Sequence, residues 1–578
     1  MINKIRSWSA TLLSIMLVII TCSIAVDAKP KDSNKEVKNV ILLIADRASV
    51  AHFTLSRWYN GGGPLPMDEW ICGLLRTYSA NTPLTDSAPA ATAFATGFKS
   101  FTGFVGVLPE TASMWSIDPQ LRTNAETGFV GVLPVKASMW GVDPQQGTDA
   151  ESRPLVTVLE ASKLAGKATG IVVTCEINHT TPAAFSAHHI RRKIKDDEAV
   201  IEQQVYNDID VVLASGAMFL KPEIRTDRED LMAVLQQKGY QFIRTREEML
   251  GSKSGKLWGL FAEQNTSYDL DKTAEEPSLV EMTAKAIAIL SRNKKGFFLM
   301  VEGAKIDWAS HQNEPVGAIS EVLAFNRAVK SAIDFARQDG NTAVIVAIDH
   351  GNGGLALGDE SVIHMGTAGA SVFIDPLKRA KHTAEGVEKA LLATADLSAD
   401  AISRFIREEY GLELSAAELE RVQGYFSGRL KDQYGLAAII GPMLSRTAHL
   451  HWTTTSHTGE DVPYAILHPR GYRPTGVIQN TAIAWYIDEI LNLNLKEWNK
   501  ILYLSAQRAF AEKGAVATVE ETSPGNLVLV VKKGAQILRL PANKNLAEVN
   551  GQTKTLRSLI VFNGKAFFVP REALDLIK

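Results

Sequence analysis

The sequence has little cysteine, little net charge and, beyond its N-terminal segment, no long hydrophobic run. Only 3 of its 578 residues are cysteine, and Cys72 and Cys175 are the two that lie outside that segment. A disulfide-stabilised scaffold is therefore excluded, although one disulfide is open to an exported chain. The formal net charge of −3 gives no electrostatic attraction to a polyanion, so we expect no nucleic-acid binding. No later stretch reaches the roughly 18 consecutive apolar residues that a membrane-spanning helix needs.

The N-terminal segment has the pattern of an export signal. Lys4 and Arg6 precede an apolar run over residues 12–26, and residues 26–28, Val-Asp-Ala, resemble a cleavage site. We predict that residues 1–28 are a signal peptide and that the protein is exported to the periplasm or the extracellular space. Cys22 in "IITC" loosely resembles a lipoprotein site, so membrane attachment would follow only from lipidation at Cys22.

Short apolar runs alternate with helical patterns along the rest of the chain. The apolar runs are typical of buried parallel strands and cover residues 39–45, 170–174, 296–301 and 342–348. Amphipathic patterns over residues 153–166 and 318–340 predict helices between them. This alternation predicts an α/β fold, with a central, mostly parallel sheet flanked by helices.

Three regions depart from that alternation. Residues 102–126 are repeated as residues 127–151, with 18 of 25 positions identical, which we interpret as a tandem duplication in a surface loop over 102–151. Residues 355–450 are rich in helical patterns and predict a helical insertion. Residues 515–578 have short alternating strands and turn signals, which predict a small C-terminal β domain. The catalytic domain is expected over residues 36–500.

The stretch "LTDSAPAATAFATG", residues 84–97, places Ser87 at the start of a predicted helix of small residues. Ser87 could serve as an N-cap, accepting hydrogen bonds from free backbone N–H groups. Alternatively, because a helix N-terminus attracts anions, Ser87 could be a nucleophile that receives a phosphoryl group.

Acids and histidines follow the predicted strands. Asp46, Glu302 and the pair Asp349–His350 come at the ends of three apolar runs, and ligands of open α/β sheets bind at such strand ends. Each acid alone could cap a helix, but clustered carboxylates are commonly held together by divalent cations.

Further candidate ligands lie outside the strands. "DWASH" places Asp307 and His311 four residues apart, on one helical face, where a surface salt bridge is the alternative. His457 lies in a polar loop before an apolar strand and could simply face solvent. Asp/His mixtures suit zinc, and Asp/Glu/Thr oxygens suit magnesium. Arg191 and Arg192 could bind phosphate through their guanidinium groups or could be solvated surface residues.

Six motifs occur in an order and spacing that resemble the alkaline phosphatase family: "VILLIAD", "TDSAPAATAFATG", "INHTTPAAFSAH", "GFFLMVEGAKIDWASH", "VIVAIDHGNGG" and "TSHTGEDVPYA". The resemblance covers about residues 38–490. It implies an exported, metal-dependent phosphomonoesterase that hydrolyses small phosphate monoesters through a phosphoserine intermediate. It also implies a homodimer.

The resemblance assigns roles to individual residues. It implies Ser87 as the nucleophile and Arg192 as the phosphate-binding residue, since the spacing of Arg191 from Thr181 fits less well. It implies two zinc ions and one magnesium ion. The implied ligands are Asp307, His311 and His457 for one zinc; Asp46, Asp349 and His350 for the second; and Asp46, Thr181 and Glu302 for magnesium, with His179 beside it. Histidine at position 179 could shift the third site away from magnesium.

One residue departs from the family pattern beside the expected metals. The family usually has a glycine-rich "GDGMG" where this chain reads "ADRASV", residues 45–50, so Arg47 stands in place of a glycine. Arg47 could add a phosphate contact, or it could crowd the site and leave a non-catalytic or weakly active phosphate- or metal-binding homologue. A phosphodiesterase or sulfatase of the same superfamily is a further alternative, but "DSAPAAT" lacks the arginine of a sulfatase motif.

Overall fold

The computed structural model describes residues 35–109, 152–190, 197–363, 369–394 and 396–578. Contacts divide the chain after Glu36, and residues Val37–Lys578 form one compact unit, which is the subject of the following description. The predicted signal peptide and Arg191 and Arg192 lie outside the described residues, as does the duplication from residue 110 onward. Among the described helices, none combines the length and apolar composition needed to cross a membrane.

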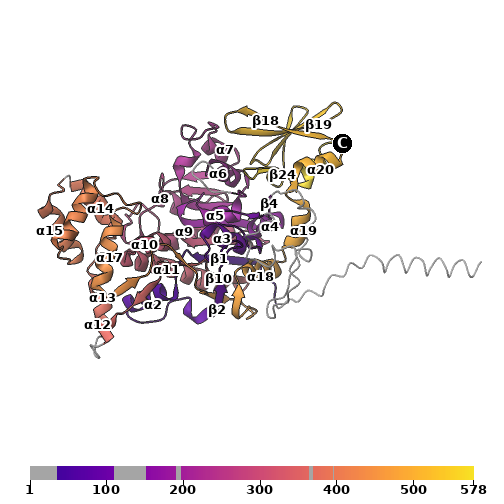
Figure 1. Ribbon diagram of the computed structural model, residues 1–578. Helices are drawn as coiled ribbons and strands as arrows, with labels where there is room; N and C mark the ends of the chain where they lie inside the picture. Colours follow the sequence, from indigo (N-terminus) through magenta and orange to yellow (C-terminus); the bar gives the residue numbers. More distant parts are fainter. Residues whose placement is uncertain (1–34, 110–151, 191–196, 364–368, 395) are drawn as a thin grey trace, which may run out of the picture. The chain divides into compact units, whose positions relative to one another are not determined.

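A ten-stranded mixed sheet is the centre of the unit (Figure 1). Its strands, in spatial order, are β16 (Gly476–Gln479), β2 (Ile71–Arg76), β15 (Val462–Leu467), β10 (Thr342–Ile348), β1 (Asn39–Ala45), β9 (Phe297–Gly303), β5 (Ala168–Glu176), β6 (Val211–Ser215), β8 (Leu257–Leu260) and β7 (Gln241–Ile243). Strand β15 runs antiparallel to both of its neighbours, and the other pairs are parallel. The prediction of a mostly parallel α/β sheet is confirmed, and all four predicted runs are strands of it.

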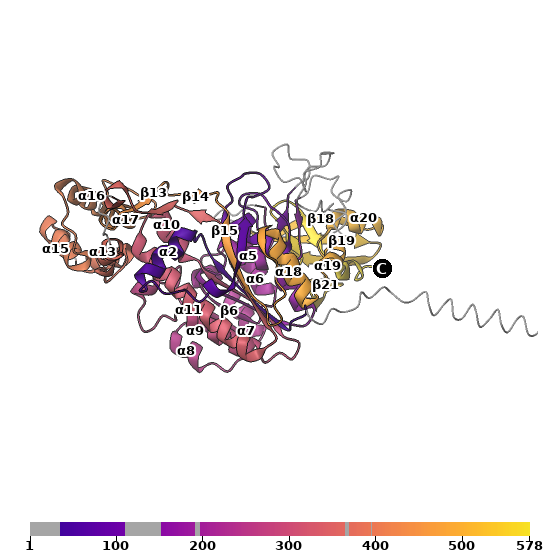
Figure 2. The ribbon, with the colours of Figure 1, turned by 90° about the horizontal axis from the view of Figure 1, so that it is seen from below.

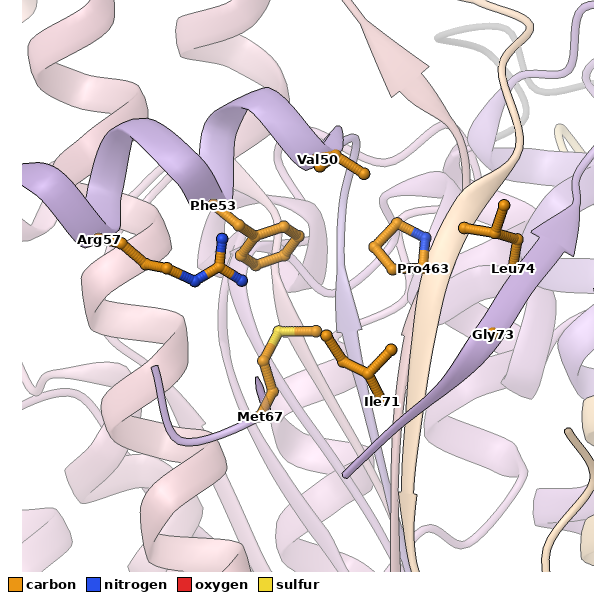
Figure 3. Close-up of a pocket in the computed structure, with 8 residues that line it drawn as sticks. All are labelled: Val50, Phe53, Arg57, Met67, Ile71, Gly73, Leu74 and Pro463. Carbon is orange, nitrogen blue, oxygen red and sulfur yellow. The ribbon is translucent and has the colours of Figure 1, made fainter. Parts of the chain in front are cut away.

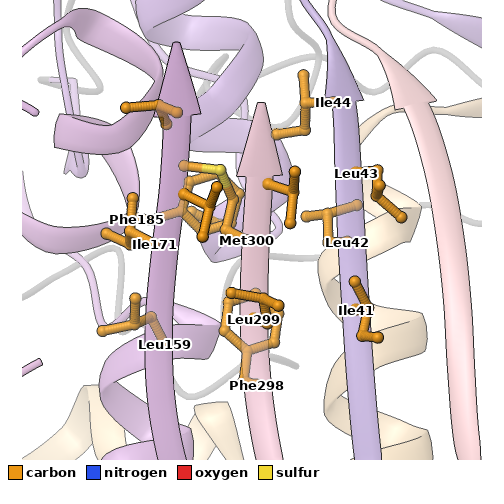
Figure 4. Close-up of a cluster of buried hydrophobic side chains, with 14 of the residues drawn as sticks. Ile41, Leu42, Leu43, Ile44, Leu159, Ile171, Phe185, Phe298, Leu299 and Met300 are labelled. Carbon is orange, nitrogen blue, oxygen red and sulfur yellow. The ribbon is translucent and has the colours of Figure 1, made fainter. Parts of the chain in front are cut away.

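Both faces of the central strands are covered. Every residue of β1 and β10 is buried, as expected for continuous runs of Val, Ile, Leu and Ala. Figure 4 shows the side chains of Ile41 and Leu43 on one side of β1 and those of Leu42 and Ile44 on the other. This alternation lets a single strand contribute to the packing on both faces.

Helices between the strands supply this cover. Helices α3, α5 and α18 pack against one another, and α9 packs against α11. The helices associated with the sheet are α2 (Val50–Tyr59), α3 (Ser87–Thr96), α4 (Val158–Leu164), α5 (Thr180–Ser186), α6 (Asp197–Tyr206), α7 (Leu231–Gln237), α8 (Arg246–Gly251), α9 (Leu279–Leu290), α10 (Lys305–His311), α11 (Pro315–Asp339), α18 (Thr481–Leu491) and α19 (Leu495–Ile501). The predicted helices over 153–166 and 318–340 correspond to α4 and α11.

The region predicted as a helical insertion contains a helical group with its own hydrophobic cluster. Its elements are β12 (Leu355–Leu357), α12 (Glu360–Ile363), α13 (Ser371–Lys378), α14 (Ala384–Thr394), α15 (Ala399–Tyr410), α16 (Ala416–Phe426), α17 (Ala437–Thr447) and β13 (Leu450–Trp452). Figure 2 shows α13, α15, α16 and α17 grouped together. Helix α17 packs against α11, so the group rests on a helix of the central layer.

The C-terminal region forms small sheets around a third hydrophobic cluster. Its elements are β17 (Leu504–Ser505), α20 (Ala506–Glu512), β18 (Val516–Ser523), β19 (Asn526–Lys533), β20 (Gln536–Pro541), β21 (Leu546–Val549), β22 (Gln552–Thr555), β23 (Val561–Phe562), β24 (Phe567–Val569) and α21 (Arg571–Leu574). The turn at Asn550–Gly551 joins β21 to β22 with positive φ at both residues, as the sequence predicts.

The segments that flank the duplication meet in the structure. Strands β3 (Val107–Leu108) and β4 (Arg153–Pro154) pair in antiparallel register on either side of it. Cys72 and Cys175 form no disulfide.

Candidate active site and metal centre

Three neighbouring strands deliver acidic residues to one edge of the sheet. Strand β1 lies between β10 and β9, and Ala45 is level with Ile348 on one side and Gly303 on the other. Asp46 and Asp349 follow directly after β1 and β10, and Glu302 is the penultimate residue of β9. The parallel register therefore places the three carboxylates close together, as the strand-end pattern predicts.

Asp46, Asp349 and His350 form a compact group of potential metal ligands. Each of the three offers one ligand atom, and these atoms lie within 4.8 Å of one another. Asp349 Oδ1 accepts hydrogen bonds from the backbone N–H groups of Arg47 and His350, both over 2.9 Å. Oδ2 of Asp46 and Oδ2 of Asp349 are buried without a hydrogen-bond partner among the described residues. Buried, unpaired carboxylate oxygens beside an imidazole are the donor set of a divalent cation site.

Ser87 is the first residue of α3 and does not cap it. Asp86 is the N-cap residue, and the Ser87 hydroxyl instead faces the acid cluster. Its Oγ lies 3.3 Å from Asp46 Oδ1, 3.4 Å from His350 Nε2 and 3.1 Å from Nη2 of Arg47. The small, buried residues that follow it in α3 bring this helix end against the strand ends.

Three histidines present the same nitrogen toward the cluster. The Nδ1 atoms of His350, His457 and His311 lie 2.9, 2.9 and 2.5 Å from the backbone oxygens of Gly351, Thr85 and Thr455 respectively. A carbonyl oxygen can only accept, so Nδ1 carries the proton and Nε2 keeps its lone pair in each ring. The rings of His350 and His457 are 4.5 Å apart between centroids, and those of His311 and His457 are 5.4 Å apart.

Asp307 and His311 lie on α10, one turn apart, as their spacing predicts. His311 Nε2 is 3.5 Å from Asp307 Oδ1, and Asn352 donates a hydrogen bond to the same oxygen over 2.8 Å. His457 belongs to the short strand β14 (His457–Thr458), which pairs with β11 (Gly351–Asn352) and so lies beside His350. The three residues of this implied zinc site are therefore brought together, but Nη1 of Arg47 contacts both Asp307 and His311.

The electrostatics of the cluster are unbalanced without added positive charge. Burial, together with Asp349 and Asp307, raises the pKa of Asp46 well above its ordinary value. Burial raises the pKa of Glu302 to about 8. Burial and the nearby Arg47 lower the pKa of His457 to about 2, so this imidazole is neutral. Acids that resist ionisation beside neutral imidazoles are expected where cations are bound.

The implied third site contains one ligand that the sequence analysis did not assign. Cys175, His179 and Glu302 present ligand atoms within 4.8 Å of one another, and Cys175 Sγ is 3.9 Å from Glu302 Oε2. Thr181, in the first turn of α5, is close enough to Glu302 to act against the rise of its pKa. Cys175 is near the end of β5, so its place at the carboxyl edge of the sheet was a usable signal.

A second unassigned residue comes from the helical group. The ring of Tyr434 stacks on His311 with 5.2 Å between centroids and 12° between planes. Tyr434 lies between α16 and α17, and no motif of the sequence marks it.

An apolar cavity lies apart from these ligands. Its volume is about 270 Å³, and Figure 3 shows that Phe53, Met67, Ile71 and Pro463 are among the residues that line it. No acid or histidine of the cluster contributes to its lining, so the cavity is separate from the candidate metal centre.

Comparisons with known proteins agree with this geometry. The family described as alkaline phosphatase matches residues 37–493 of the chain. Alkaline phosphatase 3 of Bacillus subtilis is 33% identical over 482 residues, which cover 81% of this chain and 92% of that protein. The chain therefore belongs to the alkaline phosphatase family, and the expected enzyme class is confirmed.

Solved structures of this class share the fold. The cold-active alkaline phosphatase of Shewanella sp. matches with a TM-score of 0.62 and 26% identity, over 78% of this chain and 99% of that one. The Thermus thermophilus alkaline phosphatase matches with a TM-score of 0.65 and 24% identity, over 81% and 95% of the two chains. The central sheet described above is thus the sheet of an alkaline phosphatase fold.

Proposed function

We propose that this protein is an exported, metal-dependent phosphomonoesterase that transfers the phosphoryl group of its substrate to Ser87. The single observation that supports this most strongly is the position of the Ser87 hydroxyl. It lies within 3.4 Å of a carboxylate, an imidazole and a guanidinium, at the N-terminus of a helix. That environment favours both an alkoxide and an approaching phosphate dianion.

The residues around Ser87 suggest how the transfer proceeds. Ser87 Oγ attacks phosphorus as the bond to the leaving alcohol breaks, and its proton leaves toward Asp46 Oδ1, 3.3 Å away. Water then attacks phosphorus, which breaks the bond to Ser87 Oγ and releases inorganic phosphate. Nη2 of Arg47 is placed to donate to the Ser87 oxygen or to a phosphoryl oxygen bound to it. Arg192 is proposed as a further phosphate ligand from its motif.

Metal ions complete the proposed site. Asp46, Asp349 and His350 fit zinc, because two buried carboxylate oxygens lack partners and the imidazole lone pair faces them. Glu302, Thr181 and Asp46, with His179 and Cys175 beside them, would hold a third-site ion, magnesium or zinc. When bound, such ions supply positive charge that stabilises the alkoxide and the transferring phosphoryl group.

Location and partners are proposed from the sequence. The basic start and apolar run of residues 1–28 support export to the periplasm or beyond. We propose small phosphate monoesters as substrates, since the family resemblance covers the whole catalytic region. A homodimer is proposed on the same basis.

The test is hydrolysis of p-nitrophenyl phosphate with zinc and magnesium, beside Ser87→Ala and a chelator-treated sample. Loss of activity in both controls supports the proposal. A folded, metal-loaded wild type that releases no product would contradict it and favour the alternative of a phosphate-binding homologue, since Arg47 lies beside the nucleophile.

A further inference from the structure

Arg47 projects its guanidinium into the group of ligands at Asp307 and His311. Nη1 forms an ion pair with Asp307 Oδ1 and a hydrogen bond with His311 Nε2. Nη2 reaches Ser87 Oγ. The side chain is 8% exposed, so the guanidinium is enclosed by these partners rather than by water.

The backbone fixes this direction. Arg47 directly follows Asp46 at the end of β1, and its φ of 70° lies in the left-handed region, which costs a non-glycine residue on the order of 1 kcal/mol. Its N–H donates to Asp349 Oδ1 over 2.9 Å, which holds the turn in place. A conformation that glycine adopts freely is thus kept with an arginine whose side chain points at the acids.

The contact with His311 uses the electron pair that a metal would need. His311 Nδ1 lies 2.5 Å from the carbonyl oxygen of Thr455 and therefore carries the proton. Nε2 is the only remaining acceptor of the ring, and it accepts from Arg47. A zinc ion at this position would have to displace the guanidinium from both Asp307 and His311. As arranged, these residues do not fit a resident zinc ion.

The charge of the guanidinium meets the same need as a cation. Although burial opposes it, the pKa of Arg47 is raised by Asp307, Asp46 and Asp349, so Arg47 stays charged. A guanidinium is covalently fixed and always protonated, so neither acid nor a chelator removes it.

We propose that the guanidinium of Arg47 permanently takes the place of the zinc ion at Asp307, His311 and His457. Zinc would then bind at Asp46, Asp349 and His350 but not beside Asp307. This deepens the metal dependence proposed above and rests on it. Arg47 is a fixed monovalent substitute for one of the two divalent ions that flank the nucleophile.

Zinc stoichiometry tests this without reference to activity. Metal-free wild type, Arg47→Gly, His311→Ala and His350→Ala would each be reloaded with zinc chloride, dialysed and analysed for zinc per chain. We expect Arg47→Gly to hold one zinc ion more than wild type. His311→Ala should hold as much as wild type, and His350→Ala should hold one ion fewer. In the Arg47→Gly background, His311→Ala should remove the additional ion.

Each other result has a definite meaning. Equal zinc content in wild type and Arg47→Gly overturns the substitution by Arg47 and leaves the phosphatase proposal standing. If Arg47→Gly does not fold, the single variants decide: loss of an ion from His311→Ala overturns the inference, and loss only from His350→Ala supports it. Absence of zinc from every protein overturns the metal dependence as well.

Discussion

Nη2 of Arg47 lies 3.1 Å from Oγ of Ser87, closer than either Asp46 at 3.3 Å or His350 at 3.4 Å. The nearest positive charge to the nucleophile is therefore a side chain of the protein. A guanidinium donates hydrogen bonds and one unit of charge, but it does not generate hydroxide from water as a zinc ion does.

Replacing Arg47 with glycine should consequently make hydrolysis respond more strongly to zinc. With saturating zinc, we expect kcat for p-nitrophenyl phosphate to rise by roughly tenfold or more, because a divalent ion can then occupy the vacated ligands. With zinc limiting, the variant should be slower than wild type. The measurement is kcat across a zinc titration, and Arg57→Gly serves as a control, since Arg57 instead pairs with Asp68 over 2.6 Å. An Arg47→Gly rate below that of wild type at every zinc concentration would contradict this.

The third site should prefer a softer metal than magnesium. Cys175 Sγ and a His179 nitrogen lie within 4.8 Å of a Glu302 oxygen, and sulfur and imidazole favour zinc over magnesium. We expect the double change Cys175→Ser and His179→Asp to shift the magnesium-to-zinc affinity ratio toward magnesium by on the order of tenfold or more. Competition titrations followed by calorimetry measure the ratio. Cys72→Ser is the control, and an unchanged ratio in the double variant would refute the assignment.

His52 should make the protein less stable in mild acid. Ser49 N–H donates to its Nδ1 over 3.1 Å, while Nε2 lies 3.0 Å from the Ser310 hydroxyl, which itself donates to Ile306. The buried ring is therefore neutral with its proton on Nε2, and burial lowers its pKa from 6.5 to about 4.

The sign of the effect follows from this lowered pKa. The unfolded chain takes up the His52 proton below pH 6.5, whereas the folded chain does so only near pH 4. The contribution to the free energy of unfolding is thus complete above pH 6.5 and falls by on the order of 3 kcal/mol as the pH drops to about 4. Urea unfolding of metal-free wild type and His52→Asn, near neutral pH and in mild acid, measures it. The difference between the two proteins should shrink in acid, with the exposed His451→Asn as control. A constant difference would contradict a neutral, buried His52.

Lys544 should hold the C-terminal sheets against the catalytic layer. Its ammonium lies 3.2 Å from Glu202 and 2.8 Å from Glu229, and burial raises the pKa of Glu202 to about 7. Lys544→Met leaves these carboxylates facing each other, and we expect a loss of on the order of 3 kcal/mol. Thermal melts and limited proteolysis of the segment after residue 515 report this. Lys330→Met removes an exposed pair with Asp334 and should change stability by less than about 1 kcal/mol. Equal effects of the two changes would show that the Lys544 contacts are not structural.

Much of the fold could be predicted because its strands are continuous apolar runs. The predicted runs at 39–45 and 342–348 coincide with β1 and β10, residue for residue. Strand ends also fix where Asp46, Glu302 and Asp349 must lie, since register is imposed by the sheet. The antiparallel direction of β15 was not predicted, because a short apolar run does not reveal its direction.

The site was harder to predict where tertiary contacts decide it. The sequence marks Arg47 as unusual but leaves two roles open, and only the positive φ and the enclosing acids show where its guanidinium lies. Tyr434 reaches His311 from the helical group, through a contact between residues 123 positions apart that no local pattern encodes. Ser87 could equally have been a helix cap until Asp86 was found in that position.

The most direct test of the account is to identify the residue that carries phosphate during turnover. Metal-loaded wild type and Ser87→Ala would be mixed with a phosphate monoester labelled in its phosphoryl group, quenched in acid, digested and analysed by mass spectrometry. We predict a labelled phosphoserine at Ser87 in wild type. In Ser87→Ala we predict no labelled peptide and a rate lower by at least about a thousandfold. Label on another residue, or undiminished hydrolysis by Ser87→Ala, would contradict the central claim.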